Sequence, residues 1–233
     1  MHVMILSGGL GTRISHILNG KQKCMVDIMD KPFLSYIISN LNKYEINKIT
    51  LLLGYASDAI IDYFDSSDDF DNIKITYSVD EQKLGTAGAI KNAFSKVNSE
   101  NFIALNGDTY TDLNFQSFIN HFENKKIDFG LCIKKPENTD SKDYAGIEID
   151  NDGNIVSYKE KSFGSFMSCG IYYLNRKIFY KVNDDEETSI EKQLIPKLLK
   201  ENCSIKSFIY DGPFYDIGTE NRLKNFTNYI ARI

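Results

Sequence analysis

The chain has 233 residues, of which 42% are hydrophobic and 25% are charged. These values are typical of a globular protein with enough residues to bury a substantial core. The formal net charge of −5 gives no electrostatic support for binding to nucleic acid.

Two further features bear on where the protein acts. No apolar run approaches the length of about 18 residues that spans a membrane, and the residues after Met1 do not resemble a signal peptide. The cysteines contain no C-x-x-C pair, which favours reduced thiols over a zinc site or a disulfide framework. They are Cys24, Cys132, Cys169 and Cys203. We therefore expect a cytoplasmic protein with no membrane and no nucleic-acid partner.

The first part of the chain alternates between strand and helix patterns. Residues 3–6 are a short apolar run that predicts a buried strand, and residues 32–44 place apolar side chains on one face of a helix. Further strands are expected at 48–53, 73–79, 102–105 and 129–134, with helices at 57–64, 86–97 and 115–123. This alternation predicts crossover connections and a mostly parallel, twisted sheet flanked by helices.

After about residue 135 the strands follow one another closely. Strands are expected at 146–149, 155–159, 168–174 and 203–209, and the first two form a hairpin around Gly153. Helices are expected at 176–181, 188–200 and 220–231. Thr188 and Glu191 predict a capping box, Pro196 predicts a kink or break, and Thr219 predicts the last N-cap.

A glycine-rich loop directly follows the first strand. Gly8, Gly9 and Gly11 leave backbone N–H groups open to an anion, because no Cβ stands in the way. Arg13 closes the loop and Lys23 follows ten residues later. The loop matches neither the dinucleotide fingerprint, whose third glycine is replaced by Ile14, nor the P-loop. It predicts either a phosphate site or an ordinary turn.

Two aspartates follow strand patterns in distant parts of the chain. Asp108 comes after the strand at 102–105, and ligands of parallel sheets bind at the carboxyl ends of strands. Asp216 interrupts an aromatic run, where a carboxylate is costly unless it is paired. Together they would suit Mg²⁺, which takes one or two carboxylates with phosphate oxygens and water. Alternatively, Asp108 belongs to a simple turn and Asp216 stabilises the last helix.

Two smaller elements also allow two interpretations. Gly85 and Thr86 open a helix after a strand, where small residues admit a flat ring or a phosphate, or pack tightly against the sheet. Glu160 and Lys161 end a strand of the hairpin region. They would bind hydroxyl groups and a second phosphate, or form a solvated edge.

Taken in order, these elements resemble the sugar-1-phosphate nucleotidylyltransferase family from residue 3 to about residue 225. The matching motifs are Gly8-Gly9-Leu10-Gly11-Thr12-Arg13, Lys23, Leu84-Gly85-Thr86-Ala87-Gly88, Gly107-Asp108, Tyr144-Ala145-Gly146, Glu160-Lys161, Cys169-Gly170-Ile171-Tyr172 and Asp216-Ile217-Gly218-Thr219. The length, without a hexapeptide repeat at the C-terminus, is most similar to bacterial enzymes that activate heptose 1-phosphate with GTP. The motif around Gly85 also resembles GDP-mannose pyrophosphorylases.

The resemblance implies a Rossmann-like, GT-A-like nucleotidyltransferase fold with a small antiparallel sugar-binding hairpin region. It implies one domain over residues 1–233, with a nucleotide-binding half at 1–135 and a sugar-binding half at 136–233. A phosphate oxygen of the sugar 1-phosphate would attack the α-phosphorus of a nucleoside triphosphate, and pyrophosphate would leave. Because that nucleophile is already ionised, catalysis would be positioning and charge neutralisation without a general base.

The resemblance also implies a role for each matching residue. The catalytic residues would be Arg13 on the pyrophosphate, Lys23 on the α-phosphate and Asp108. Mg²⁺ would be held by Asp108 and Asp216. The nucleotide would contact Leu6, Gly8, Gly9, Gly11, Thr12, Arg13, Lys23, Gly85 and Thr86. The sugar phosphate would contact Gly146, Glu160, Lys161 and Ser168.

The chain departs from the family pattern at three places. Residues Ile14-Ser15-His16-Ile17 follow Arg13 where the family usually has Leu-Arg-Pro-Leu. Gln22 and Cys24 flank Lys23 where the family usually has prolines, and Ser168 stands where many members have an asparagine that contacts the sugar. The sequence therefore leaves open a hexose 1-phosphate as substrate, any of GTP, UTP, CTP or dTTP as donor, and assembly into a homo-oligomer. The expected role is in surface polysaccharide synthesis.

Two other functions were weighed against the transferase. A non-catalytic regulatory subunit that binds a nucleotide sugar would be expected to lose Arg13, Lys23 or a metal aspartate, and all are present. An activator of a non-sugar phosphate such as phosphocholine would not be expected to keep Glu160 with Lys161, nor the motif that starts at Asp216.

Overall fold

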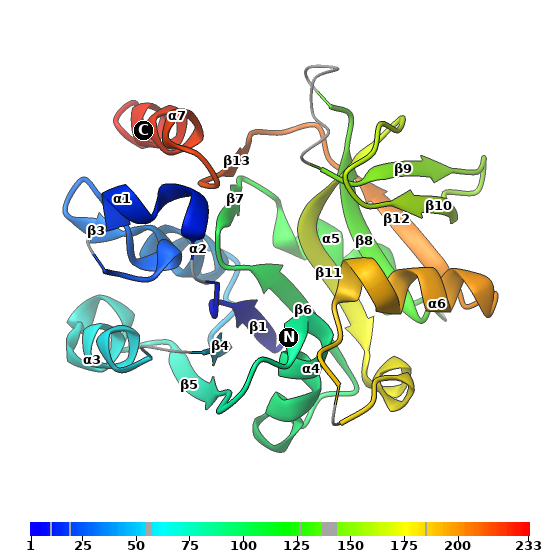
Figure 1. Cartoon of the computed structure of the whole chain (residues 1–233), viewed down its shortest axis with the longest axis horizontal. Coiled ribbons are helices and arrows are strands. Elements are labelled where there is room, and N and C mark those ends of the chain that lie inside the picture. The colour runs from blue at the N-terminus through cyan, green and yellow to red at the C-terminus, as the bar shows by residue number, and fades with distance from the viewer. Residues whose placement is uncertain (10, 19, 55–56, 126, 137–143, 185) are drawn as a thin grey trace.

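A computed structural model describes residues 1–9, 11–18, 20–54, 57–125, 127–136, 144–184 and 186–233 of the chain (Figure 1). Its centre is a seven-stranded sheet with the order β12-β8-β11-β6-β1-β4-β5. The strands are β1 (Val3–Leu6), β4 (Lys48–Leu53), β5 (Lys74–Val79), β6 (Asn101–Asn106), β8 (Phe129–Lys134), β11 (Met167–Asn175) and β12 (Ile205–Ile209). Only β11 runs antiparallel to its neighbours in this sheet, so the predicted mostly parallel sheet is confirmed.

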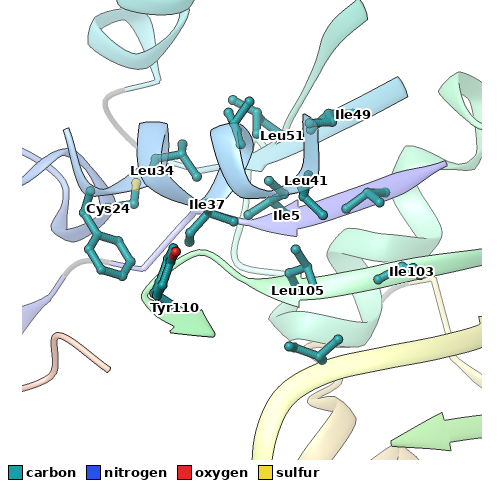
Figure 2. Packing of buried hydrophobic residues seen from close by; sticks show 14 of the residues in the cluster. Ile5, Cys24, Leu34, Ile37, Leu41, Ile49, Leu51, Ile103, Leu105 and Tyr110 are labelled. Carbon is teal, nitrogen blue, oxygen red and sulfur yellow. The ribbon is translucent and has the colours of Figure 1, made fainter. Parts of the chain in front are cut away.

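Helices cover both faces of the sheet, each over its own apolar cluster. One face carries α2 (Phe33–Asn42), α3 (Asp58–Ser66), α5 (Phe115–Glu123) and α7 (Glu220–Ile230). The other carries α4 (Gly85–Asn92) and α6 (Ile195–Lys200). Figure 2 shows Ile37 and Leu41 of α2 lying over Ile5 of β1. Burial of each such side chain stabilises the fold by about 1.5–3 kcal/mol. This packing holds the strands, and therefore the strand ends that carry the predicted site, in place.

Three short antiparallel pairs lie outside the main sheet. They are β2 (Asp27–Ile28) with β3 (Lys31–Pro32), β7 (Thr109–Thr111) with β13 (Phe214–Asp216), and β9 (Gly146–Ile149) with β10 (Ile155–Lys159). The β9–β10 hairpin was predicted, and Gly153 makes its turn with a φ of 73°. The hairpin packs beside α6 (Figure 1). The other two pairs were not predicted.

The segment before α6 differs from the predicted helix in an instructive way. Residues Ile190–Leu194 form a π-helix, and α6 then begins with Pro196 in its first turn. Leu194 and Ile195 keep helical φ and ψ, so the chain stays helical here, and the segment changes from π to α next to Pro196 without a break. The predicted capping box is wrong, because the N-cap is Ser189, whose hydroxyl accepts from Lys192 N at 3.2 Å. Glu191 instead turns toward β11.

Short 3-10 turns lie at Asp68–Phe70, Ala93–Lys96 and Arg176–Lys181. The glycine-rich loop leads into a turn at Thr12–Ile14 and α1 (Ser15–Leu18), and a further turn covers Lys23–Met25. Within the described ranges, no helix combines the length and apolar character needed to cross a membrane.

Candidate active site

The glycine-rich loop leaves the sheet where the ends of β1 and β6 meet. Gly107 N donates to Leu6 O at 2.9 Å, which ties the two strand ends together. A Cβ on Gly107 would stand 2.7 Å from Ser7 Oγ, so no larger residue fits there without a shift. Gly8 lies against Gly54 at the end of β4, with its Cβ position 3.3 Å from Gly54 N. The predicted phosphate loop therefore sits at the carboxyl ends of three parallel strands.

Gly9 and Gly11 have different surroundings within this loop. The Cβ position of Gly9 has no heavy atom within 4 Å among the described residues, so the loop is open at that point. Gly11 has a φ of +61°, and its Cβ position is 2.8 Å from both Leu18 Cδ1 and Lys23 Cβ. Only glycine allows this contact, because other residues rarely adopt the φ and would collide. Gly11 therefore packs the loop directly onto Lys23.

Lys23 reaches Asp108 from a buried position. The side chain of Lys23 is 10% exposed and that of Asp108 is 40% exposed, and Lys23 Nζ lies 2.6 Å from Asp108 Oδ2. A buried ammonium group needs an opposite charge nearby, and Asp108 supplies it. Because Asp108 is partly exposed, the ion pair lies where the site opens to water. The turn around Lys23 is itself buried at Gln22 and Cys24, the positions where the family usually has prolines.

The pairing of β7 with β13 brings Asp108 and Asp216 side by side. Asp216 pairs with Thr109, the residue after Asp108, and Ile217 N donates to Asp108 O at 3.1 Å. The two carboxylates that the sequence predicts to share a cation therefore lie at one end of the β7–β13 pair, Asp108 just before β7 and Asp216 as the last residue of β13.

Asp216 is held by several donors. Its Oδ1 accepts from Gly218 N at 2.9 Å and from Arg222 Nη1 at 3.2 Å, and its Oδ2 accepts from the hydroxyl of Tyr144. The Arg222 guanidinium lies over the Tyr144 ring, 5.0 Å from its centre. Sequence reasoning gave no role to Tyr144 or Arg222, because nothing in the local sequence indicates which carboxylate they meet.

Arg13 approaches the same carboxylate from the glycine loop. Its Nη2 is 3.1 Å from the Cβ position of Gly218, and Asp216 Oδ1 is 2.7 Å from that position. The predicted residues Arg13, Lys23, Asp108 and Asp216 are therefore gathered at one place, where cationic and anionic groups alternate.

The two carboxylates fit a magnesium ion that also binds phosphate. No group of three or more His, Cys, Asp or Glu side chains that could hold a metal occurs in the described part of the chain. Asp108 and Asp216 nevertheless offer hard oxygen donors at the same end of the β7–β13 pair. Mg²⁺ commonly takes only one or two carboxylates and completes its shell with phosphate and water.

The predicted sugar-side residues lie around the β9–β10 hairpin and β11. A Cβ on Gly146 would collide with the backbone of Phe163, so the loop after Lys161 packs closely on β9. Lys161 is exposed with a φ of 51°, and Glu160 Oε1 lies 3.7 Å from Lys192 Nζ. Ser168 is on β11, where its hydroxyl accepts from Gly170 N at 3.1 Å.

The predicted nucleotide element at Gly85 and Thr86 is packed against the segment before the π-helix. Ala87 N and Gly88 N donate to Thr188 O at 2.8 and 3.3 Å, and Thr86 Oγ1 accepts from Ile190 N at 2.7 Å. A Cβ on Gly85 would lie 2.6 Å from Thr188 O. Tight packing, the alternative considered for this element, therefore accounts for these amides. The nucleotide contact of Gly85 and Thr86 stays a prediction.

The chain matches a known protein family over nearly its whole length. The family model described as nucleotidyl transferase matches residues 2–232. The chain belongs to the nucleotidyl transferase family.

The transferase is similar over nearly its whole length to two heptose 1-phosphate guanylyltransferases and to a solved structure. It is 33% identical over 228 residues to D-glycero-alpha-D-manno-heptose 1-phosphate guanylyltransferase of Campylobacter jejuni, covering 97% of this chain and 98% of the relative. It is 34% identical over 220 residues to the protein of that name from Aneurinibacillus thermoaerophilus, covering 94% and 93%. The crystal structure of HddC from Yersinia pseudotuberculosis complexed with GMP-PN matches with a TM-score of 0.83 and 31% identity, covering 99% of this chain and 100% of that one.

These matches confirm the predicted fold and the predicted class of enzyme, a sugar-1-phosphate nucleotidylyltransferase. In this nucleotidyl transferase the thiol next to Lys23 is neutral. Burial, reinforced by the charge of Asp108, raises the pKa of the Cys24 thiol to about 12. Cys24 Sγ donates to Ser7 O at 3.7 Å, which fastens the Lys23 turn to the start of the glycine loop.

Proposed function

We propose that the chain transfers GMP from GTP to heptose 1-phosphate and releases pyrophosphate. The observation that carries the transfer is the convergence of the Lys23–Asp108 pair and Asp216 beside the glycine loop. The choice of GTP and heptose 1-phosphate is supported by the similarity to two heptose 1-phosphate guanylyltransferases over more than nine-tenths of each chain.

The chain's own groups suit an in-line displacement at the α-phosphorus. The attacking oxygen of a sugar phosphate is ionised near neutral pH, so no side chain needs to remove a proton. Lys23 would neutralise charge on the α-phosphate and on the entering phosphate. Arg13, close to Asp216, would do the same for the leaving pyrophosphate. These fixed charges act where negative charge accumulates, which lowers the barrier without reorganisation.

The glycine loop would hold the triphosphate through its backbone. Gly9 has open space at its Cβ position, which leaves room for a phosphate against the main chain. Asp108 and Asp216 would hold Mg²⁺, which when bound supplies positive charge to the triphosphate. Leu6, Gly8, Gly85 and Thr86 would bind the base and ribose.

The sugar 1-phosphate would lie on the hairpin side of the site. Lys161, exposed at the end of β10, would bind its phosphate, and Glu160 would accept hydrogen bonds from its hydroxyls. The backbone at Gly146 and the hydroxyl of Ser168 would complete the contact. Free thiols at Cys24, Cys132, Cys169 and Cys203 fit the reducing cytoplasm, where we expect the reaction to take place.

The test is pyrophosphate release with GTP, UTP, CTP and dTTP, each against heptose, mannose and glucose 1-phosphates. We expect GTP with heptose 1-phosphate to give a kcat/KM at least about tenfold above any other pair, which is a difference of about 1.4 kcal/mol. A different best pair would contradict the proposed substrates. No release with any pair, by a protein shown to be folded, would contradict the transfer itself.

A further inference from the structure

The carboxylate of Glu191 is surrounded by hydroxyl groups from three parts of the chain. Its Oε1 accepts from the Tyr172 hydroxyl at 2.7 Å. Its Oε2 accepts from Ser189 Oγ at 3.0 Å and from Thr86 Oγ1 at 3.3 Å. Tyr172 belongs to β11 and Thr86 to α4. One side chain therefore joins the element predicted to bind the nucleotide to the strand predicted to bind the sugar.

On the sugar side the connection runs along β11. The ring of Tyr172 is fully buried, and Tyr172 lies on β11 four residues after Ser168. The pairing of β11 with β8 is irregular between Ser168 and Tyr172, where Gly170 has a φ of 66°. A bulge of this kind redirects side chains next to functional sites. Glu191 thus holds β11 at Tyr172, on the strand that also carries Ser168.

On the nucleotide side the connection is made twice, by side chain and by backbone. Thr86 Oγ1 both donates to Glu191 and accepts from Ile190 N. Thr188 O accepts from the first amides of α4, and Thr188 N donates to Leu84 O at 2.8 Å. The start of α4 is therefore fixed to residues 188–191, from which the π-helix begins. Single π-turns are frequent at functional sites, where they redirect one side chain.

We propose that Glu191 is a positioning residue that holds the start of α4 and the Ser168 strand in one fixed arrangement, so that both substrates are aligned. This inference rests on the proposed function, because it assigns Glu191 to that same site. A partly buried carboxylate that accepts from three hydroxyls makes strong, directional bonds, so it fixes the spacing of the groups it joins. In-line transfer is sensitive to that spacing.

The experiment compares Glu191→Ala, Glu191→Gln and Tyr172→Phe with the wild type in the pyrophosphate-release assay. Glu187→Ala is the matched control, because Glu187 lies in the same segment but pairs with Lys83 at the surface. We expect Glu191→Ala to raise the KM for GTP and the KM for heptose 1-phosphate each about tenfold, the effect of losing a charged hydrogen bond. Tyr172→Phe should raise the KM for heptose 1-phosphate alone, and the control should change neither.

Tyr172→Phe carries the test if Glu191→Ala does not fold, and Glu191→Gln is the conservative replacement. The amide keeps one carbonyl acceptor, and the hydroxyls can reorient toward its NH₂ group, so we expect each KM to rise by no more than about threefold. Thermal unfolding of every variant identifies a merely structural role. A lower Tm with both KM values within about twofold of wild type, for Glu191→Ala or, where that variant does not fold, for Tyr172→Phe, would overturn the proposal.

The wild type in the same assay separates this inference from the proposed function. If the wild type prefers another nucleotide or sugar phosphate, the proposed substrates are wrong, and the variants are compared on the preferred pair. If the wild type releases no pyrophosphate, calorimetric titration with GTP and with heptose 1-phosphate replaces the assay. Weaker binding of both by Glu191→Ala then supports the positioning role, and unchanged binding, or no binding by the wild type, overturns it.

Discussion

Lys23 Nζ and Asp108 Oδ2 lie 2.6 Å apart although 85 residues separate them in the chain. The lysine is nearly buried and the aspartate is partly exposed, so the two charges differ in their access to water. Removing Asp108 leaves a buried charge without its carboxylate, whereas removing the charge of Lys23 leaves an aspartate that water can reach. The two substitutions should therefore differ in stability even though both impair the reaction.

We expect Asp108→Asn to lower the free energy of unfolding by about 1–2 kcal/mol, less than for a fully buried pair because Asp108 is partly exposed. Lys23→Met should be neutral or stabilising, because it replaces a buried cation by an apolar chain of similar length. Both variants should reduce kcat by about a hundredfold or more, since each removes a charge from the proposed phosphate site. Urea unfolding with pyrophosphate release measures both quantities, and a Lys23→Met variant that is less stable than Asp108→Asn would contradict this account.

Substitutions at Gly9 and Gly11 should distinguish a loop residue that contacts the ligand from one that packs the loop onto the protein. Gly9→Ala adds a Cβ in open space, so it should change stability by less than about 0.5 kcal/mol and raise the KM for GTP several-fold. Gly11→Ala combines an unfavourable φ with a 2.8 Å contact on Lys23 Cβ, and should cost about 1–3 kcal/mol. Gly20→Ala is the control, because its φ is +82° but its Cβ position has no neighbour within 4 Å in the described chain. Equal KM values for Gly9→Ala and wild type would argue against a phosphate at Gly9.

Removal of divalent cations should stop the reaction. With excess EDTA we expect no pyrophosphate release, and added Mg²⁺ should restore it, because Asp108 and Asp216 would hold the cation with the triphosphate. Binding of Mn²⁺ to the protein with GTP, followed by electron paramagnetic resonance, should weaken at least about tenfold in Asp216→Asn, which loses a charged ligand. Full activity in EDTA would remove the metal from the proposal.

The strands of the main sheet were predictable, whereas the contacts that assemble the site were not. Apolar runs such as 48–53 and 129–134 have the predicted bounds, because burial of alternating or continuous apolar residues is a local signal. The β7–β13 pair has three residues in each strand and joins segments about a hundred residues apart, so no local pattern indicates it. Yet this pair brings Asp108 and Asp216 together. The sequence indicated the two carboxylates and not the pairing between them.

Glu191 shows the opposite failure, in which a local signal was present and misleading. A threonine followed three residues later by a glutamate predicts a capping box. In the structure Ser189 caps the helix, and the carboxylate bonds Tyr172, whose buried hydroxyl needs a partner. A tertiary contact that satisfies a buried polar group therefore outweighs a cap that a neighbouring hydroxyl can provide.

Cys24 predicts a specific change of stability with pH. Its pKa in the folded protein is raised to about 12 from the ordinary value of 9.0, so the folded state retains a proton that the unfolded chain loses. This contribution is fully present below about pH 9 and is lost as the pH rises from about 9 toward about 12. The stability advantage of wild type over Cys24→Ala should therefore shrink by about 2 kcal/mol between pH 8 and pH 10.5. Urea unfolding of both proteins at each pH measures it, since the other titrating groups are common to the two. A constant difference would show that the Cys24 thiol titrates normally in the folded protein.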